Sequence, residues 1–316
     1  MVSRRLIRIK TFQILYSQFS KNEMEFDISY KELRKSISKT QDLFFFLLRL
    51  IVDLKDYNLD RIEINKNKQL ASREDLSPKM AFVENKVIAL IEENIQYQRF
   101  QSGNYLNWND HRDVIEKIYK AFINTDTFKS YLNKEERSIK DDKKIISFLL
   151  EEIIGNYSDI LNVLEEISIY WTEDFEFVIN NILKTVRKIK ATDSDEKLLS
   201  EIYKNDDDKE FAYNLLKFVL QNHDDSIELI EKHAKNWEID RIIQIDILLM
   251  EMALAELIKM PSIPIKVSLD EYIELSKYYS SAKSKTFING ILDKIIIELK
   301  DNSLISKKGR GLIGQA

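Results

Sequence analysis

The chain contains no cysteine and very little glycine or proline: its 316 residues include 6 Gly and 3 Pro. Without Cys, disulfides, thiolate metal sites and thiol nucleophiles are excluded. Gly and Pro are the residues that most often break a chain into turns, so their scarcity favours long helices over sheets. Because 44% of the residues are hydrophobic, a sizeable core is possible. The composition therefore predicts an all-α protein.

Long apolar runs are also missing. The longest, residues 43–52, is interrupted by Arg49 and is too short to cross a bilayer. The first ten residues lack the apolar segment and cleavage site of a signal peptide. We expect a protein that is soluble in the cytoplasm and has no membrane partner.

Motifs for catalysis are absent as well. Neither G-x-x-x-x-G-K-S/T nor G-x-G-x-x-G occurs, so no phosphate-cradling loop is indicated. His111, His223 and His233 are the only imidazoles, and they lack metal-ligand spacing with acidic residues. Adjacent acids such as Glu151 and Glu152 point in different directions on a helix and cannot share a proton. We expect a protein that is not an enzyme and holds no metal and no organic cofactor.

Basic residues are concentrated locally although the formal net charge is −5. Residues 1–10 contain no acid. The basic residues of the two local groups are Arg4, Arg5, Arg8 and Lys10, and then Lys283 and Lys285. An aromatic residue follows each group: Tyr16 follows the N-terminal group, and Phe287 follows the group formed by Lys283 and Lys285. Single-stranded RNA suits such a pattern, because its phosphates attract cations and its unstacked bases lie on rings.

Three linked helices are predicted in residues 237–299. The first runs from about Ile239 to Lys259 and ends at a Pro-rich turn. Ser268 and Glu271 have capping-box spacing and predict the start of the second. The third starts near Ser284. Gly290 within it predicts that another backbone packs closely there.

These helices carry the sequences A-L-A-E-L, then P-I-K-V-S-L-D-E-Y-I-E-L-S-K, then F-I-N-G-I-L-D-K. Together they resemble the carboxy-terminal half of the NusB family of bacterial transcription antitermination factors. The arginine-rich start, which runs into a helix with Ile14, Leu15 and Tyr16, resembles the family's first helix. The family-like parts are residues 1–20, the N-terminal segment, and residues 205–300, the C-terminal core. Residues 301–316 are expected to be a disordered basic tail.

Residues 21–204 depart from the compact family pattern and are predicted to be a large helical insertion. A strong helix is expected over Gln41–Leu59, and Ser77-Pro78 predicts a helix that continues to about Phe100. Because Gln41–Leu59 carries many large apolar residues, we expect the insertion to pack on the core as folded helices.

The resemblance implies a helical bundle of two small subdomains, enlarged by the inserted helices. It also implies a non-catalytic protein that binds a boxA-like segment of the ribosomal RNA leader together with the ribosomal protein NusE. This complex would promote read-through by RNA polymerase. The RNA-binding residues expected on this basis are Arg4, Arg5, Arg8, Lys10, Tyr16, Lys283, Lys285 and Phe287. Family members often have an acid where Lys283 stands. Asp246 is expected to contact the protein partner.

Purely structural interpretations of these residues remain open at this point. The basic segments and Asp246 could be solvated helix faces, and Phe287 could belong to the core. Two other functions also remain: a helical part of an RNA-modification system associated with a methyltransferase, or a structural adaptor without RNA binding.

Overall fold

The computed structural model describes residues 3–21, 25–103, 106–190, 203, 205–234 and 243–308. Within these residues the protein is built from helices and contains no strand, so the all-α prediction is confirmed. Among the same residues, no helix is long and apolar enough to cross a membrane. The expected helix start at Ile239 and the end of the tail, residues 309–316, lie outside the described residues.

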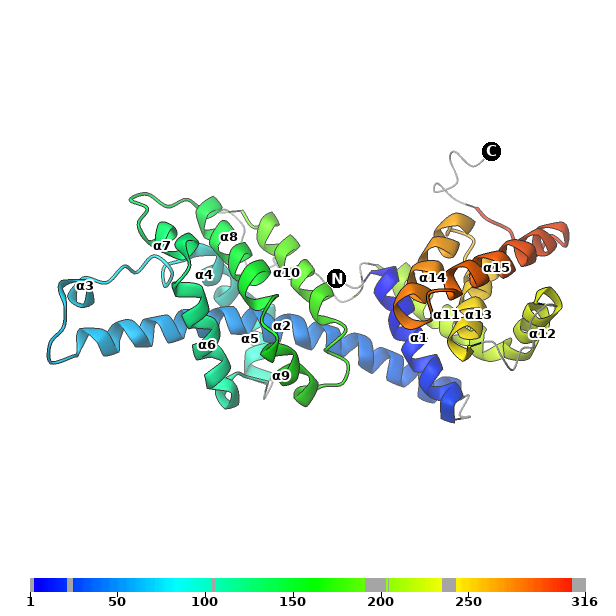
Figure 1. The fold of residues 1–316 in the computed structure, drawn as a ribbon, viewed down its shortest axis with the longest axis horizontal. Helices are drawn as coiled ribbons and strands as arrows, with labels where there is room; N and C mark the ends of the chain where they lie inside the picture. Colours follow the sequence, from blue (N-terminus) through cyan, green and yellow to red (C-terminus); the bar gives the residue numbers. More distant parts are fainter. Residues whose placement is uncertain are drawn as a thin grey trace. The chain divides into compact units, whose positions relative to one another are not determined.

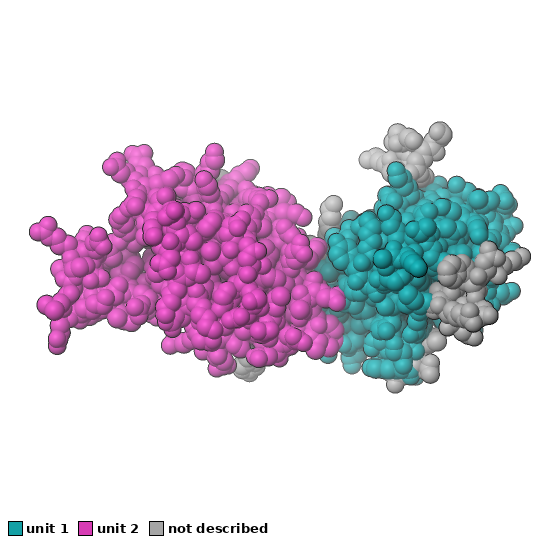
Figure 2. Space-filling model, viewed as in Figure 1, with its two compact units in different colours: residues 1–37, 202–316 teal, residues 38–201 magenta. Residues whose placement is uncertain are grey.

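The chain divides into two compact units (Figure 2). Unit 1 comprises Met1–Ile37 and Ile202–Ala316, and unit 2 comprises Ser38–Glu201. Unit 1 is therefore discontinuous in sequence, and residues 25–37, which the sequence pattern groups with the insertion, belong to it. The helix α2, Phe26–Lys66, contributes residues to both units.

Unit 1 is a bundle around the apolar helix α13 (Figure 1). Its helices are α1 (Arg4–Lys21), the first part of α2, α11 (Asp206–Gln221), α12 (His223–His233), α13 (Gln244–Lys259), α14 (Ile265–Tyr279) and α15 (Ser284–Asp301). Nearly every residue of α13 from Leu248 to Leu257 is buried, because α1, α11, α12, α14 and α15 all pack against it. A helix that is apolar all round needs such a position.

Unit 2 has an aromatic core of its own. Its helices are the rest of α2, α3 (Arg73–Leu76), α4 (Lys86–Glu93), α5 (Ile95–Gly103), η1 (Asn109–His111), α6 (Arg112–Ile123), α7 (Asp126–Leu132), α8 (Ile139–Phe148), η2 (Leu149–Ile154), α9 (Asp159–Ile167) and α10 (Phe175–Lys188). Trp108 is fully buried, stacks on Phe46 with 4.3 Å between ring centroids, and donates its Nε1–H to the Phe46 carbonyl at 3.0 Å. The ring of Trp171 also lies against Phe46, with 5.3 Å between centroids. The insertion is thus folded around large buried rings.

Three local predictions are wrong. α14 begins at Ile265, directly after Pro264, so Ser268 lies inside the helix and its side chain does not cap it. Apart from its own helix, none of the residues that the structure describes lies within 4 Å of a Cβ placed on Gly290, so no second backbone among them packs closely there. Ser77 ends the short helix α3, and the next helix, α4, is capped by Asn85 instead.

Candidate nucleic-acid interface

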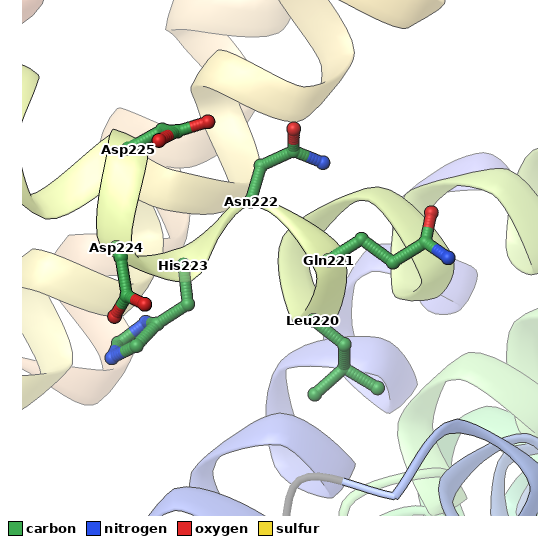
Figure 3. A pocket seen from close by; sticks show the side chains of 6 residues that line it. All are labelled: Leu220, Gln221, Asn222, His223, Asp224 and Asp225. Carbon is green, nitrogen blue, oxygen red and sulfur yellow. The ribbon is translucent and has the colours of Figure 1, made fainter.

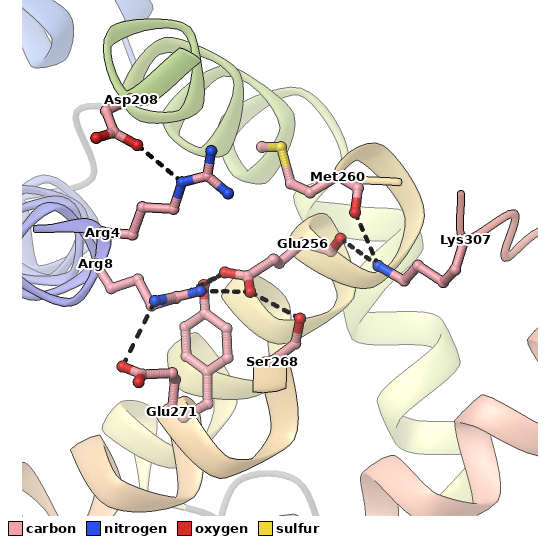
Figure 4. Close-up of polar contacts among 9 residues, drawn as sticks. Arg4, Arg8, Asp208, Glu256, Met260, Ser268, Glu271 and Lys307 are labelled. Atoms are coloured by element: carbon pink, nitrogen blue, oxygen red, sulfur yellow. Dashed lines mark hydrogen bonds and ion pairs between the residues drawn. The ribbon is translucent and has the colours of Figure 1, made fainter. Parts of the chain in front are cut away.

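The inward side of α1 is tied to α13 and α14 by a buried ion-pair network (Figure 4). The Arg8 guanidinium donates to both oxygens of Glu256, at 2.8 Å and 2.7 Å, and lies 3.5 Å from the Glu271 carboxylate. The hydroxyls of Ser268 and Tyr272 donate to Glu256 at 2.7 Å and 3.0 Å. Glu256 is fully buried, and these four hydrogen bonds compensate for its lost hydration.

Arg8 stays charged inside this network. Burial alone would lower the pKa of Arg8, but the hydrogen bond and the charge of Glu256 outweigh burial and raise it. Because its side chain is 3% exposed and faces carboxylates, Arg8 is not among the residues that we propose below to contact RNA. The physical reason is that a carboxylate inside the protein already occupies the guanidinium fork.

Two further cations that were predicted to bind RNA, Lys10 and Arg4, are wholly or partly buried in unit 1. Lys10 is completely buried, so it cannot reach an RNA phosphate at the surface. Arg4 is one third exposed and pairs with Asp208, in the first turn of α11, at 2.9 Å. Its guanidinium also lies 5.5 Å from the Phe211 ring centroid. Of the four N-terminal cations, Arg5 is the exposed one.

The outward side of α1 presents Arg5 and Tyr16. These residues are eleven positions apart, so they lie within about 20° of each other around the axis and about 16 Å apart along it. Tyr16 is 39% exposed and stacks on the buried ring of Phe12, with 6.1 Å between centroids. Phe12 in turn contacts Tyr279, at the end of α14, at 4.8 Å. The preceding ring in α14, Tyr278, is 74% exposed.

Cations from three helices converge on this side around Glu274 of α14. The pKa of Glu274 is lowered, first by the hydrogen bond from Lys277, and also by the charges of Arg5 and Lys285. Arg5 belongs to α1 and Lys285 to the first turn of α15, so two basic groups far apart in sequence lie near one carboxylate. We call Arg5, Tyr16, Lys277, Tyr278, Lys283, Lys285 and Phe287 the α1–α15 face.

Within the described residues, no carboxylate lies within ion-pair distance of Arg5, Lys283 or Lys285. Lys283 and Lys285 are exposed, and Phe287, half-buried, follows in the first turn of α15. The ring of Phe287 is thus at the edge of the apolar stripe that continues with Ile288 and Ile291, both buried.

Asp246 holds the loop before α15 and does not lie on the surface. It is 4% exposed and accepts a hydrogen bond from the Ser280 hydroxyl. The Ser280 hydroxyl also lies 2.9 Å from that of Ser284, which is 2.8 Å from the Ser281 hydroxyl. A buried carboxylate that already accepts a hydrogen bond is not offered to a partner at the surface, so we do not include Asp246 in the interface proposed below. The serine cluster, which sequence reasoning missed, fixes the start of α15 and with it Lys283 and Lys285.

The end of the described chain returns to α13. The Lys307 ammonium donates to the carbonyls of Glu256 and Met260 at 3.1 Å and 3.0 Å, at the point where α13 ends. Burial lowers the pKa of Lys307 to about 8. A cation here is stabilised by the negative dipole end of the helix. The segment through Lys308 is thus attached to unit 1.

A second polar site joins α12 to α13. His223 Nδ1 lies 2.6 Å from the carboxylate of Glu251, which is 1% exposed. The hydrogen bond with Glu251 raises the pKa of His223, and burial raises the pKa of Glu251. Residues 220–225 line a small pocket beside this pair (Figure 3). Phe19 of α1 covers the imidazole at 4.8 Å, so the pair anchors α12 to its neighbours. Among the described residues, no cluster of His, Asp and Glu could hold a metal ion.

The geometry thus defines a helical protein that exposes cations and aromatic rings on α1, α14 and the start of α15. Residues 173–296 match the NusB family. The chain is 43% identical to the transcription antitermination protein NusB of Salinibacter ruber over 139 residues, which is 42% of this chain and 87% of that protein. It is 44% identical to the protein of the same name from Chloroherpeton thalassium over 105 residues, covering 33% and 50% of the two chains. For the Myxococcus xanthus protein of the same name the identity is 35% over 118 residues, covering 37% and 84%. No solved structure matches. The chain belongs to the NusB family.

Proposed function

We propose that this protein is a transcription antitermination factor that binds single-stranded RNA through the α1–α15 face. Its named relatives are transcription antitermination proteins. We further propose that the RNA is a boxA-like leader segment, bound with the ribosomal protein NusE, and that the complex promotes read-through by RNA polymerase.

The observation that carries the proposal is that Arg5, Lys283 and Lys285 are exposed and, within the described residues, have no carboxylate within ion-pair distance. The charges of Arg5 and Lys285, 280 positions apart, both lower the pKa of Glu274, which agrees with their lying on one side of unit 1. The exposed rings of Tyr16 and Tyr278 belong to the same two helices as Arg5 and Glu274, α1 and α14. Cations that are not committed to internal carboxylates are available to phosphates, and exposed rings on the same helices are available to bases. An α/β cofactor-binding domain, which the methyltransferase-associated alternative requires, does not fit the described residues of unit 2, since they are helical.

Removing the cations of this face is expected to weaken RNA binding and its salt dependence. In the triple variant Arg5→Gln, Lys283→Gln and Lys285→Gln, the slope of log K against log salt should become shallower by about 0.7 for each phosphate that is no longer neutralised. Fluorescence anisotropy with a boxA-like single-stranded RNA measures the slope. Read-through of a terminator downstream of that RNA, with NusE present, should fall in parallel.

The matched control removes the same charge elsewhere on unit 1, at exposed cations away from the face. Lys209→Gln, Lys294→Gln and Lys300→Gln meet this need. Equal slopes for the two triple variants would remove the α1–α15 face from the RNA site.

Tyr16 is expected to stack a base. Tyr16→Ala should cost about 1–3 kcal/mol of RNA affinity, whereas Tyr16→Phe, which keeps the ring, should bind nearly as well as the unaltered chain. Because Tyr16 is 39% exposed, the melting temperature should change little in either variant. A titration that finds Ala and Phe equivalent would contradict a stacking role.

A further inference from the structure

The insertion carries its own basic surface on α8 and α10. α8 turns Ile145 and Ile146 into the core of unit 2 and leaves Lys140 and Lys144, one turn apart, exposed. α10 buries Ile182 and Val186 and leaves Lys184 and Lys188, also one turn apart, exposed. Both pairs follow the four-residue spacing that places side chains on one line of a helix.

These two lines of lysines belong to one surface. α8 and α10 pack against each other, and Figure 1 shows them side by side in unit 2. The Lys143 ammonium donates to the carbonyl of Arg187 at 3.0 Å, which joins the middle of α8 to the end of α10. The Arg187 guanidinium then reaches Glu151 at 2.7 Å. The hydrogen bond between Lys143 and Arg187 thus lies at the contact between the two helices. Lys140 and Lys144 are on the α8 side of this contact, and Lys184 and Lys188 are on the α10 side.

Among the residues that the structure describes, the charges on this surface have no internal acidic partner. Elsewhere in unit 2, cations such as Lys55 and Arg137 pair with acids, here Glu92 and Glu84. Within the described residues, by contrast, no carboxylate lies within 4.0 Å of the amine of Lys140, Lys144, Lys184 or Lys188.

The acids nearest in sequence to Lys140 and Lys144 already have partners. Asp141 pairs with Lys134 and accepts from the Ser138 hydroxyl. Asp142 is buried and accepts from the Tyr131 hydroxyl at 2.7 Å. Like charges on neighbouring helices repel one another, and a polyanion relieves that repulsion and releases its own counterions on binding.

We propose that Lys140, Lys144, Lys184 and Lys188 form a second RNA-binding surface that holds the phosphate backbone. The proposal goes beyond the function proposed above, which places RNA on unit 1 alone, and it rests on that function for the nature of the partner. Lysine ammoniums are point charges with no planar fork for a base edge, so binding at this surface is independent of RNA sequence. The proposal assigns the insertion the task of strengthening RNA binding.

The test uses the full chain and an unstructured uridine-rich RNA. The quadruple variant replaces each of the four lysines with Gln, which retains helix propensity. The control variant removes the same charge from exposed cations in or near α2, α5 and α6 that have no acid within ion-pair distance among the described residues. These are Lys66, Lys68, Arg99 and Arg112, each replaced with Gln.

Compared with the control, the quadruple variant should show a slope of log K against log salt that is shallower by about 0.7 for each phosphate left without its lysine. The same change should appear when the uridines are replaced by adenines. A slope equal to that of the control would overturn the proposal. So would unchanged RNA binding accompanied by loss of binding to vesicles of anionic phospholipid, which would make the surface a membrane-binding one.

The triple variant of Arg5, Lys283 and Lys285 is measured in parallel. An unaltered slope in the triple variant contradicts the function proposed for unit 1, and an unaltered slope in the quadruple variant contradicts the RNA-binding surface proposed for unit 2. Because the substitutions lie in different units, the two failures are distinguishable.

Discussion

Glu256→Ala is expected to lower the free energy of unfolding of unit 1 by about 3–5 kcal/mol. Arg8 is 3% exposed and has Glu256 as its bidentate partner. Without this carboxylate, a buried guanidinium and the buried hydroxyls of Ser268 and Tyr272 lose their acceptor. Chemical denaturation followed by circular dichroism measures the change, and amide hydrogen exchange in α1 and α14 identifies where protection is lost.

The double variant Arg8→Met with Glu256→Leu provides the control. Replacing both partners of a buried ion pair with apolar side chains of similar volume is often neutral, since neither charge is then left alone. The double variant should therefore recover most of the stability lost in Glu256→Ala. A cost below about 1 kcal/mol for Glu256→Ala would mean that water reaches Arg8, and the network would not be the anchor of α1.

Trp108→Ala is expected to lower the stability of unit 2 by about 3–5 kcal/mol. The indole is fully buried, stacks on Phe46, and donates a hydrogen bond to the Phe46 carbonyl. The substitution removes a large side chain from a packed core and leaves that carbonyl without its indole donor. Differential scanning calorimetry should show the effect in the transition that Glu256→Ala leaves unchanged, because each unit has its own core.

Trp108→Phe separates the two contributions, since it retains a stacked ring and removes the N–H donor. We expect it to cost less than half as much as Trp108→Ala. If neither substitution changed the calorimetric unfolding transition of unit 2, the cluster around Phe46 would not be the centre of the unit 2 core.

Helix class and core positions could be predicted from sequence because they depend on neighbours three or four residues away. The apolar stripe of α15 and its start at Ser284 are examples, and the NusB resemblance rests on the same local patterns. Ser268 shows the limit of such reasoning. Its spacing to Glu271 fits a capping box, but α14 already begins directly after Pro264. The Ser268 hydroxyl donates a hydrogen bond to the Glu256 carboxylate instead.

The candidate site was harder to predict, because the type of residue does not reveal its partner. Arg5 and Arg8 look alike in the sequence, yet Arg8 meets a carboxylate on α13 and Arg5 meets solvent. Asp246 likewise looks like a surface acid until Ser280, on a different helix end, is brought to it. Only the packing of α1, α13 and α14 distinguishes the cations that stabilise the fold from those that are exposed to solvent.

The ion pair between Arg8 and Glu256 also has a consequence for synthesis on the ribosome. Its two residues are 248 positions apart in the chain. At about 5–20 residues per second, α1 would wait roughly 12–50 seconds for α13 to be made. All of unit 2 is synthesised in that interval, and it is a compact unit with a core of its own, so it can fold first. During this time α1 exposes an apolar stripe beside unpaired arginines, which makes the nascent chain a candidate for chaperone binding until the last third of the protein arrives.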